Sequence, residues 1–431
     1  MIGELRDKVG ERAAIRGWVN AVRDQKRMQF LIVRDETGLA QVVVDKQDPP
    51  SELNEQISAL TAESAISVGG TVVADERVKL GGLELRLESL HVDSLAEPEL
   101  PIAPDSSMDK RIDWRYLDLR RPERRLIFEV QTTVEHAMRE FWRKQGFIEL
   151  HSPKLMGSAS ESGAELFKVE YFDRTAYLAQ SPQFYKQMAM AAGFGRVFEV
   201  GPVFRANPSF TSRHDTEFTS VDVEISWIDS HEDVMAFEEA WLAHVLEGVA
   251  REHGEIVEKT FGSQVVVPSL PFPRITLANA KEMLREQGVP GVGGQLDLDP
   301  VSERALSELV KERYGHEFAF VTDYPTSVRP FYHMRHAADA GLTKSFDLLW
   351  RGLELTTGAQ REHRYEQLVA QASEKGVETE SIQYYLDFFR FGCPPHGGFG
   401  FGLTRLLMRL LAQDNVREVT FLYRGPHRLT P

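Results

Sequence analysis

Two stretches far apart in the chain combine arginines with residue types that suit a polyphosphate ligand. Residues 204–218 read FRANPSFTSRHDTEF and contain Arg205 and Arg213 between apolar runs. Residues 396–406 read HGGFGFGLTRL, a glycine-rich segment that leads into Arg405. Guanidinium groups bind phosphates through paired hydrogen bonds, and glycines let a backbone approach a ligand closely. Two such elements, about 190 residues apart, predict one polyphosphate held from two sides.

The first 100 residues read as β-structure with one helical insertion near residues 51–63. Glycine, aspartate and asparagine turns separate five strand-like runs: AAIRGWVNAVRD, MQFLIVRDETG, LAQVVVDK, ISVGGTVVADE and GLELRLESLHV. Five short strands with one helix predict an OB-fold β-barrel over residues 1–100. The basic first hairpin favours nucleic-acid binding over a purely structural role.

The remaining chain reads as α+β. A proline-bearing stretch within residues 101–123 predicts an extended hinge, and a long amphipathic helix follows from about Arg124 to Gln145, with Gly146 as its stop. Strands and helices then alternate irregularly through the predicted second domain, residues 124–431. This order predicts a mostly antiparallel sheet flanked by helices.

Charge and composition restrict the class of protein. The chain of 431 residues has a net charge of −15, which argues against indiscriminate nucleic-acid binding. Residues 15–34 and 110–125 are nevertheless basic, and ordinary solvated surface and a nucleic-acid ligand explain this pattern equally well. There is one cysteine, no apolar run long enough to span a bilayer and no signal-peptide pattern. A reducing, cytoplasmic setting is therefore expected.

These segments resemble the three motifs of class II aminoacyl-tRNA synthetases. The helix 124–145 with the strand FIEL and Pro153 is similar to motif 1, residues 204–218 to motif 2, and residues 396–406 to motif 3. The runs YLAQSPQFYKQM and SFDLLWRGLELTTGAQREHRY resemble the aspartate-specific branch in its compact form, found mainly in archaea and some bacteria. The resemblance extends over nearly the whole chain and implies an OB-fold anticodon domain on a class II catalytic domain, active as a homodimer through motif 1.

The resemblance implies a site for ATP. Arg205 would bridge the α-phosphate and the amino-acid carboxylate, and Phe218 would stack on the adenine. The motif 2 loop would fold over the β- and γ-phosphates, while motif 3 would clamp the γ-phosphate from the opposite side. The implied ATP-binding residues are Arg205, Arg213, His214, Asp215, Phe218, Glu354, Gly402 and Arg405, of which Arg205 and Arg405 would be catalytic.

A magnesium site is implied at Glu354 and Thr357, with Asp347 as a further ligand. Mg²⁺ prefers oxygen ligands and often takes one or two carboxylates together with substrate phosphates. Seven residues apart in a single strand, Asp347 and Glu354 would point to opposite faces. Joint use of both carboxylates therefore requires a bulge or turn near Arg351 and Gly352.

The implied amino-acid pocket suits L-aspartate. A buried substrate carboxylate needs cationic partners, and by resemblance Lys186 and Arg361 hold the β-carboxylate. Glu161 and Gln183 match positions on the α-ammonium side. Arg205 and Thr357 complete the implied aspartate-binding set. Asparaginyl enzymes generally lack the lysine at Lys186, so its presence favours aspartate.

The barrel carries the implied anticodon contacts. Phe30 and Gln41 match family residues that stack on and hydrogen-bond the central uracil. Asn20 and Lys79 match positions that separate enzymes strict for tRNA(Asp) from relaxed ones that also charge tRNA(Asn). Asn20 is smaller than the tryptophan of strict enzymes, which favours relaxed specificity, whereas Lys79 matches the strict pattern.

Four residues depart from the family pattern: Asn207, Thr357, Ala359 and Thr404. They leave two alternatives to an aspartate–tRNA ligase open. One is an asparagine–tRNA ligase on the same fold. The other is a catalytically weakened paralogue that binds tRNA or a substrate-like inhibitor.

Overall fold

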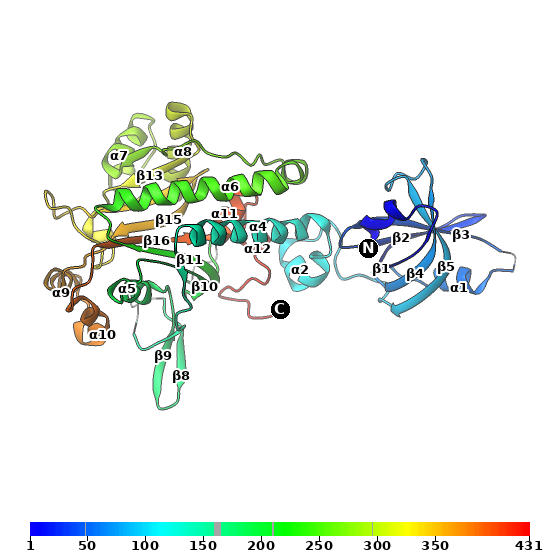
Figure 1. Ribbon diagram of the computed structural model, residues 1–431, viewed down its shortest axis with the longest axis horizontal. Coiled ribbons are helices and arrows are strands. Elements are labelled where there is room, and N and C mark those ends of the chain that lie inside the picture. Colours follow the sequence, from blue (N-terminus) through cyan, green and yellow to red (C-terminus); the bar gives the residue numbers. More distant parts are fainter. Residues whose placement is uncertain (48, 159–164, 209–210, 295) are drawn as a thin grey trace. The chain divides into compact units, whose positions relative to one another are not determined.

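The chain forms two compact units in a computed structural model. The structure describes residues 1–431 except 48, 159–164, 209–210 and 295 (Figure 1). Backbone contacts divide the chain into Met1–Leu117 and Asp118–Pro431. Each unit has a hydrophobic core of its own.

The first unit contains the predicted five-stranded barrel. Its strands are β1 (Arg12–Asp24), β2 (Met28–Asp35), β3 (Gly38–Asp45), β4 (Ala65–Ala74) and β5 (Leu83–Ser94). They close in the order β1-β2-β3-β5-β4, with only the β3–β5 pair parallel. A 3₁₀ helix, η1 (Ile2–Lys8), precedes the barrel, and α1 (Glu52–Ser58) lies in the predicted helical insertion. The OB-fold prediction is confirmed.

Alternation along the strands decides which side chains fill the barrel. In β2, Leu31 and Val33 are at most 1% exposed and pack in the barrel core together with Val42 of β3. Successive strand residues point to opposite faces, so Phe30 lies on the outer face. Gln41 pairs with Ile32 across the two strands, which puts its side chain on that same outer face.

The second unit, Asp118–Pro431, is built on an eight-stranded sheet in the order β12-β13-β14-β15-β16-β11-β10-β6. Only the terminal pairs, β12–β13 and β10–β6, are parallel, so the predicted mostly antiparallel sheet is confirmed. The strands are β6 (Ile148–Glu149), β10 (Arg196–Phe204), β11 (Glu217–Ser226), β12 (Arg274–Thr276), β13 (Phe318–Thr322), β14 (Ser345–Trp350), β15 (Leu353–Gln360) and β16 (His396–Gly402).

Three helices cover one face of this sheet: α4 (Pro122–Lys144), α6 (His231–Phe261) and α11 (Leu403–Leu410). The first of them is the predicted long helix, and Gly146 follows it with a positive φ of 78°. Trp142 of α4 stacks on Trp241 of α6 with ring centroids 5.1 Å apart. Helix α5 (Gln183–Ala191) lies on the opposite face, as Figure 1 shows.

Smaller elements complete the structure. A three-stranded sheet contains β7 (Leu155–Met156), β9 (Arg174–Leu178) and β8 (Lys168–Tyr171). The remaining helices are α2 (Met108–Asp113), α3 (Arg115–Asp118), α7 (Leu277–Glu286), η2 (Val292–Gly294), α8 (Pro300–Tyr314), η3 (Thr326–Val328), α9 (Tyr365–Glu374), η4 (Thr379–Ile382), α10 (Gln383–Leu386), η5 (Asp387–Phe389) and α12 (Val416–Val419). Within the described part of the chain, no helix is both long enough and apolar enough to cross a bilayer.

Strand β11 shows how the sheet separates its core from a polar face. Val221 and Val223 are fully buried in the core beneath α4 and α6. Ser220, Asp222 and Glu224 alternate with them and point to the opposite face. The side chains that could do chemistry are therefore collected on one face of the sheet by strand geometry.

One buried acid on the helix-covered side predicts a pH-dependent stability. Burial raises the pKa of Glu238 in α6 to about 8. The unfolded state then loses this proton at lower pH than the folded state, so stability falls as pH rises from about 4.5 to about 8. Replacement Glu238→Gln should stabilise the protein by on the order of 2–4 kcal/mol at pH 8. The gain should disappear near pH 4.5, as measured by denaturant unfolding.

The exposed Glu255 on the same helix offers a matched control. Replacement Glu255→Gln should change stability by less than about 0.5 kcal/mol at either pH. A Glu238→Gln variant whose stability tracks that control across the pH range would contradict a protonated Glu238.

Candidate active site

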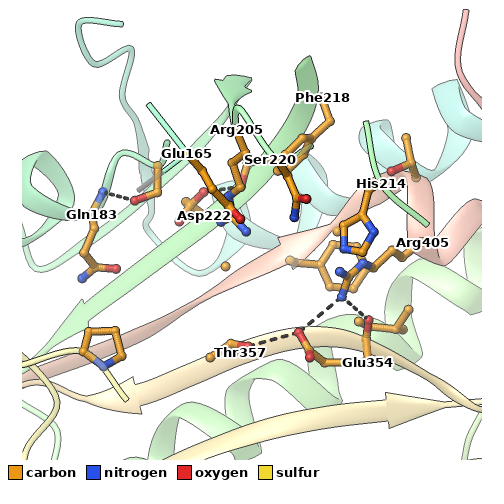
Figure 2. Close-up of a pocket in the computed structure, with 18 of the residues that line it drawn as sticks. Glu165, Gln183, Arg205, His214, Phe218, Ser220, Asp222, Glu354, Thr357 and Arg405 are labelled. Atoms are coloured by element: carbon orange, nitrogen blue, oxygen red, sulfur yellow. Dashed lines mark hydrogen bonds and ion pairs between the residues drawn. The ribbon is translucent and has the colours of Figure 1, made fainter. Parts of the chain in front are cut away.

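A cavity of about 340 Å³ opens on the polar face of the sheet. Strands β11, β15 and β16 and the beginning of α11 supply its walls, together with loop residues around positions 205–215 and 329–333 (Figure 2). Eleven predicted site residues line it: Gln183, Arg205, Arg213, His214, Asp215, Phe218, Glu354, Thr357, Arg361, Gly402 and Arg405. The two arginine-bearing stretches of the sequence therefore meet at one cavity.

Arg205 stands directly after β10. Its backbone N–H donates to the carbonyl of Thr216 at 3.0 Å, which continues the β10–β11 pairing past the last strand residue. The guanidinium lies over the ring of Phe218, 5.5 Å from the ring centroid. Phe218 is half-buried and lines the cavity rather than the core, so its ring borders the space that a ligand would occupy.

Side-chain contacts hold residues 211–214 of the loop after Arg205 in place. Arg213 Nη1 donates to Glu303 Oε2 of α8 at 2.8 Å. His214 Nδ1 lies 2.6 Å from Thr211 Oγ1, and the Tyr423 hydroxyl donates to the His214 carbonyl. Burial, followed by the charges of Arg405 and Arg213, lowers the pKa of His214. Its imidazole is therefore neutral at neutral pH.

Asp215 differs from an ordinary surface carboxylate. Its side chain is buried, and Oδ2 has no hydrogen-bond partner among the residues that the structure describes. Burial raises the pKa of Asp215 to about 7. The cavity thus has an acid that is largely protonated below neutral pH, which reduces the negative charge facing an anionic ligand.

Arg405 reaches across to β15 from the first turn of α11, whose N-cap is Gly402. Its Nη1 donates to the Glu354 carbonyl at 2.9 Å and to Glu354 Oε1 at 3.3 Å. This contact fixes the guanidinium at the cavity, which Arg205 also lines. Figure 2 shows the two arginines approaching the same space.

A tight turn brings the predicted metal ligands to one face. Arg351 and Gly352 have positive φ values of 47° and 75°, and they connect β14 to β15 as a hairpin. Asp347 therefore pairs directly across from Thr357, and the Thr357 hydroxyl donates to Glu354 Oε1 at 3.2 Å. The turn near Arg351 and Gly352 that joint use requires is present.

These oxygens suit a hard cation. Burial, and then the Asp347 carboxylate, raise the pKa of Glu354 to about 7. Asp347 Oδ2 accepts from Arg329 at 2.5 Å, while its Oδ1 has no partner in the described part of the chain. Mg²⁺ takes carboxylate and hydroxyl oxygens of this kind. Asp347 is 3% exposed, however, and lies behind the cavity lining rather than on it.

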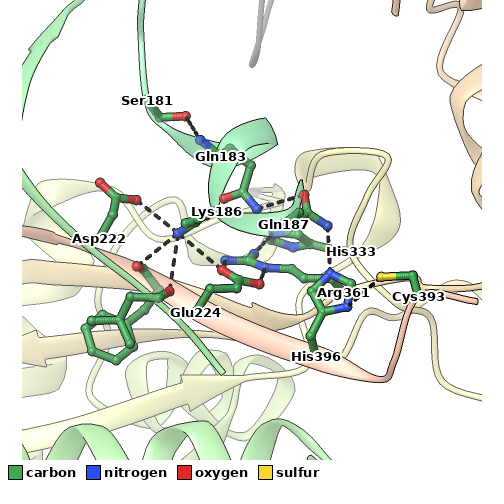
Figure 3. Close-up of polar contacts among 12 residues, drawn as sticks. Ser181, Gln183, Lys186, Gln187, Asp222, Glu224, His333, Arg361, Cys393 and His396 are labelled. Carbon is green, nitrogen blue, oxygen red and sulfur yellow. Dashed lines mark hydrogen bonds and ion pairs between the residues drawn. The ribbon is translucent and has the colours of Figure 1, made fainter. Parts of the chain in front are cut away.

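Below the cavity lies a buried charge cluster, which we define as Lys186, Arg361, Asp222 and Glu224 (Figure 3). Lys186 Nζ lies 2.9 Å from Asp222 Oδ1 and 3.4 Å from Glu224 Oε2. Arg361 donates to Glu224 Oε1 from Nε at 3.0 Å. Burial opposes ionisation of Glu224, but Arg361 and Lys186 outweigh it and hold the pKa of this carboxyl below its usual value.

The cluster places the two predicted aspartate-binding cations differently. Arg361 lines the cavity, whereas Lys186 lies behind Asp222 and also donates to the Phe399 carbonyl at 3.1 Å. Our sequence reasoning missed both carboxylates. The alternation of apolar and acidic residues in SVDVEI was the available signal, because it predicts a strand with Asp222 and Glu224 on one face.

Gly398 of β16 is required by this cluster. A Cβ at that position would overlap the Glu224 carboxylate and the Val223 carbonyl. A glycine in the motif 3 strand is therefore a packing requirement, separate from any approach of the backbone to a ligand.

The α-ammonium side of the predicted pocket is described only in part. Gln183 lines the cavity and donates to Gln187 Oε1 at 2.9 Å. Glu161 lies outside the described residues. Glu165 lines the cavity near Gln183 and was not among the predicted residues (Figure 2).

The departures from the family pattern do not all reach the site. Asn207, Thr357 and Thr404 line the cavity. Ala359 is fully buried in β15, opposite Gly398, and does not line the cavity as the described residues form it. Any effect on a ligand would therefore be direct for the first three residues and indirect for Ala359.

The four predicted anticodon residues lie on the surface of the barrel unit. Phe30 and Gln41 share the outer face of β2 and β3, and Gln41 donates to Glu84 at 3.2 Å. Asn20 stands at an irregularity of the β1–β2 pairing, where its Oδ1 accepts from Arg34 at 3.3 Å. Lys79 is exposed in the connection between β4 and β5.

Two family models match the chain, one over the barrel and one over the larger unit. Residues 107–424 match the model described as tRNA synthetases class II (D, K and N), and residues 13–93 match an OB-fold nucleic acid binding domain. A class II sheet that gathers arginines on its polar face, preceded by an OB-fold barrel, defines a class II aminoacyl-tRNA synthetase.

Relatives that match this chain over its whole length identify the family more closely. An aspartate–tRNA(Asp/Asn) ligase of Methanopyrus kandleri is 46% identical over 99% of this chain and 97% of its own length. An aspartate–tRNA(Asp) ligase of Pyrococcus abyssi is 42% identical over 98% and 97%. The chain belongs to the aspartate–tRNA ligase family of class II synthetases, in its archaeal-type form.

Solved structures show the same fold. An asparaginyl-tRNA synthetase from Pyrococcus horikoshii, complexed with asparaginyl-adenylate, superposes with a TM-score of 0.90 at 33% identity, covering 99% of this chain and 97% of that one. An aspartyl-tRNA synthetase from Entamoeba histolytica has a TM-score of 0.89 at 33% identity, with 100% and 92% covered. The overall fold is therefore common to aspartate and asparagine enzymes, and the amino acid must be distinguished by individual residues.

The buried charge cluster predicts a large cost for losing its lysine. Replacement Lys186→Met should destabilise the protein by about 3–5 kcal/mol, because Asp222 and Glu224 would be buried with one cation fewer. Chemical denaturation measures this. The double variant Lys186→Met/Asp222→Asn should recover part of the loss, since it removes one of the uncompensated carboxylates.

Lys144 provides a control, because its ion pair with Glu140 is exposed. Lys144→Met should cost less than about 1 kcal/mol. If Lys186→Met were as mild as Lys144→Met, the cluster would not be the structural element that its contacts indicate.

Proposed function

We propose that this chain is an aspartate–tRNA ligase that activates L-aspartate with ATP and transfers it to the 3′ end of tRNA(Asp). The observation that carries the proposal is the meeting of Arg205, Arg405 and Arg361 at one cavity. Five arginines line the cavity in a protein with a net charge of −15, whereas burial raises the pKa of two lining acids, Asp215 and Glu354, to about 7. A cationic cavity of this kind suits ATP together with a dicarboxylic amino acid.

Activation requires positioning and charge neutralisation rather than a protein nucleophile. The α-carboxylate oxygen of aspartate forms a bond to the α-phosphorus of ATP, and the bond from that phosphorus to the pyrophosphate oxygen breaks. Arg205 would neutralise the carboxylate and α-phosphate as they approach. Arg213, His214 and Arg405 would hold the outer phosphates, and Phe218 would pack on the adenine.

Mg²⁺ fits the oxygens beside Arg405. Glu354 and Thr357 would hold the ion. Asp347 lies across from Thr357 in the next strand, and its Oδ1 has no hydrogen-bond partner among the residues that the structure describes. Bound there, Mg²⁺ would neutralise phosphate charge in ATP and in the departing pyrophosphate. The same carboxylates would then be ionised, because a divalent cation lowers the pKa of its ligands.

Aspartate is favoured over asparagine by the cations around the deep end of the cavity. Arg361 would bind the β-carboxylate through its guanidinium, with Lys186 adding a second positive charge from behind Asp222. Gln183 and Glu161 would face the α-ammonium group, and Thr357 and Arg205 would complete the pocket. Neutral asparagine would offer these cations no carboxylate in addition to Asp222 and Glu224.

We also propose that the barrel reads the anticodon and that the enzyme accepts tRNA(Asn) as well as tRNA(Asp). Phe30 and Gln41 would contact the central base from the outer face of β2 and β3. Asn20 contacts Arg34 and fills little space, so either pyrimidine could follow that base. The active form would be a homodimer that pairs through α4 and the segment after it.

The first test of this function is amino-acid-dependent ATP–pyrophosphate exchange. Aspartate should drive exchange, and Arg205→Ala should reduce it by about 3–4 kcal/mol of transition-state stabilisation, roughly 10²–10³-fold. Arg196→Ala at the other end of β10 should leave the rate unchanged. Exchange driven by asparagine would favour the asparagine enzyme, and no exchange with either amino acid would favour the weakened paralogue.

The second test uses pure transcripts of the two tRNAs. Aspartylation of tRNA(Asn) should be less than about a thousandfold weaker than that of tRNA(Asp), a difference below roughly 4 kcal/mol. Asn20→Trp should lower charging of tRNA(Asn) more than that of tRNA(Asp). A wild-type ratio above a thousandfold would make the enzyme discriminating.

A further inference from the structure

Three side chains from separate segments meet away from the cavity. His231 is the first residue of α6, Asp323 follows β13, and His336 lies in the segment between β13 and β14. Each offers one ligand atom, and these atoms all lie within 4.8 Å of one another. His336 Nε2 lies 2.9 Å from Asp323 Oδ1, and His231 Nε2 lies 4.0 Å from the same oxygen.

These separations bracket those of a tetrahedral metal site. Metal bonds of about 2.0–2.1 Å to imidazole nitrogen and carboxylate oxygen place neighbouring ligand atoms roughly 3.3 Å apart. Small side-chain rotations would bring all three atoms to that spacing. Asp323 and His336 are only half-buried, so an ion can enter from solvent, and a fourth position remains for water.

His231 is poorly hydrogen-bonded when no ion is bound. It is 8% exposed, and its Nδ1 has no hydrogen-bond partner within the described ranges of the chain. At 4.0 Å, its Nε2 is too far from Asp323 for a hydrogen bond. Burial lowers the pKa of His231 to about 4, so the imidazole is a neutral ligand at physiological pH.

Nearby cations do not prevent binding. Arg274 and Lys344 both act on His231. Arg274 is neutralised by Glu232 and Glu239 at 2.8 and 3.2 Å, and Asp323 supplies a negative charge inside the cluster. Lys344 has no ion pair among the described residues, and its single positive charge is a modest opposition to two imidazoles and a carboxylate.

We propose that His231, Asp323 and His336 form a binding site for a divalent transition metal such as Zn²⁺, separate from the Mg²⁺ that accompanies ATP. Two imidazoles and one carboxylate suit Zn²⁺, Co²⁺ or Ni²⁺, whereas Mg²⁺ prefers oxygen ligands alone. The ion would tie the start of α6 to the segment between β13 and β14. That segment carries Arg329 and His333 to the cavity, so the metal would brace one wall of the active site.

The test uses the full chain, stripped with a chelator and kept in excess Mg²⁺ to occupy the nucleotide-linked site. Titration with Co²⁺ should give visible absorption bands typical of a four-coordinate nitrogen and oxygen site, saturating at one ion per chain. His336→Gln and Asp323→Asn should each weaken Co²⁺ binding at least tenfold. Asparagine tolerates the positive φ of 63° at position 323, so that variant keeps the backbone conformation.

His91 supplies a matched control, because it is an exposed histidine 3.7 Å from the Asp93 carboxylate. Among the described residues, this pair belongs to no group of three possible metal ligands. His91→Gln should bind Co²⁺ like the wild type. Zn²⁺ should raise the unfolding midpoint of the wild type and of this control by about 2 °C or more, and should not raise that of the two site variants.

The proposal is overturned if the wild type shows neither Co²⁺ bands nor a Zn²⁺-dependent midpoint. It is equally overturned if His336→Gln and Asp323→Asn respond to both metals as the wild type does. Unfolding midpoints of all variants in chelator, expected to match the wild type, separate loss of the ligand from loss of the fold.

Discussion

The second unit, Asp118–Pro431, depends on the buried charge cluster at the centre of its sheet. Lys186 and Arg361 are balanced by Asp222 and Glu224, so two positive and two negative charges are buried together. Removing or displacing one partner of a buried ion pair destabilises a protein strongly, because it leaves a buried charge without compensation. The cluster therefore fixes α5 against β11 and aligns β15 with its neighbours, and it excludes any side chain at position 398.

This constraint also decides the electrostatics of the cavity above it. Lys186 and Glu224 lie behind the cavity lining, whereas Arg361 lines the cavity together with Arg205, which follows the C-terminal end of β10, and Arg405, which follows β16. Two lining acids lose charge as burial raises the pKa of Asp215 and Glu354 to about 7. A protein that is acidic overall thereby offers a cationic site to an anionic nucleotide and an anionic amino acid.

Much of the fold was predictable from local sequence patterns. Strand alternation and turn residues predicted the five-stranded barrel, and apolar periodicity predicted α4. The requirement for a turn at Arg351 and Gly352 followed from strand geometry alone. The partners of Lys186 were not predictable in the same way, because α5, β11 and β15 meet only in the folded sheet. His231, Asp323 and His336 are likewise distant in sequence and carry no spacing that marks a metal site.

The central claim is that the buried cluster sets the cavity for a charged rather than a neutral amino-acid side chain. Equilibrium binding of L-aspartate and L-asparagine to the protein, measured by calorimetry without ATP or tRNA, tests it most directly. We predict that aspartate binds at least about tenfold more tightly, a difference of roughly 1.4 kcal/mol or more. Equal binding of the two amino acids, or tighter binding of asparagine, would contradict the claim.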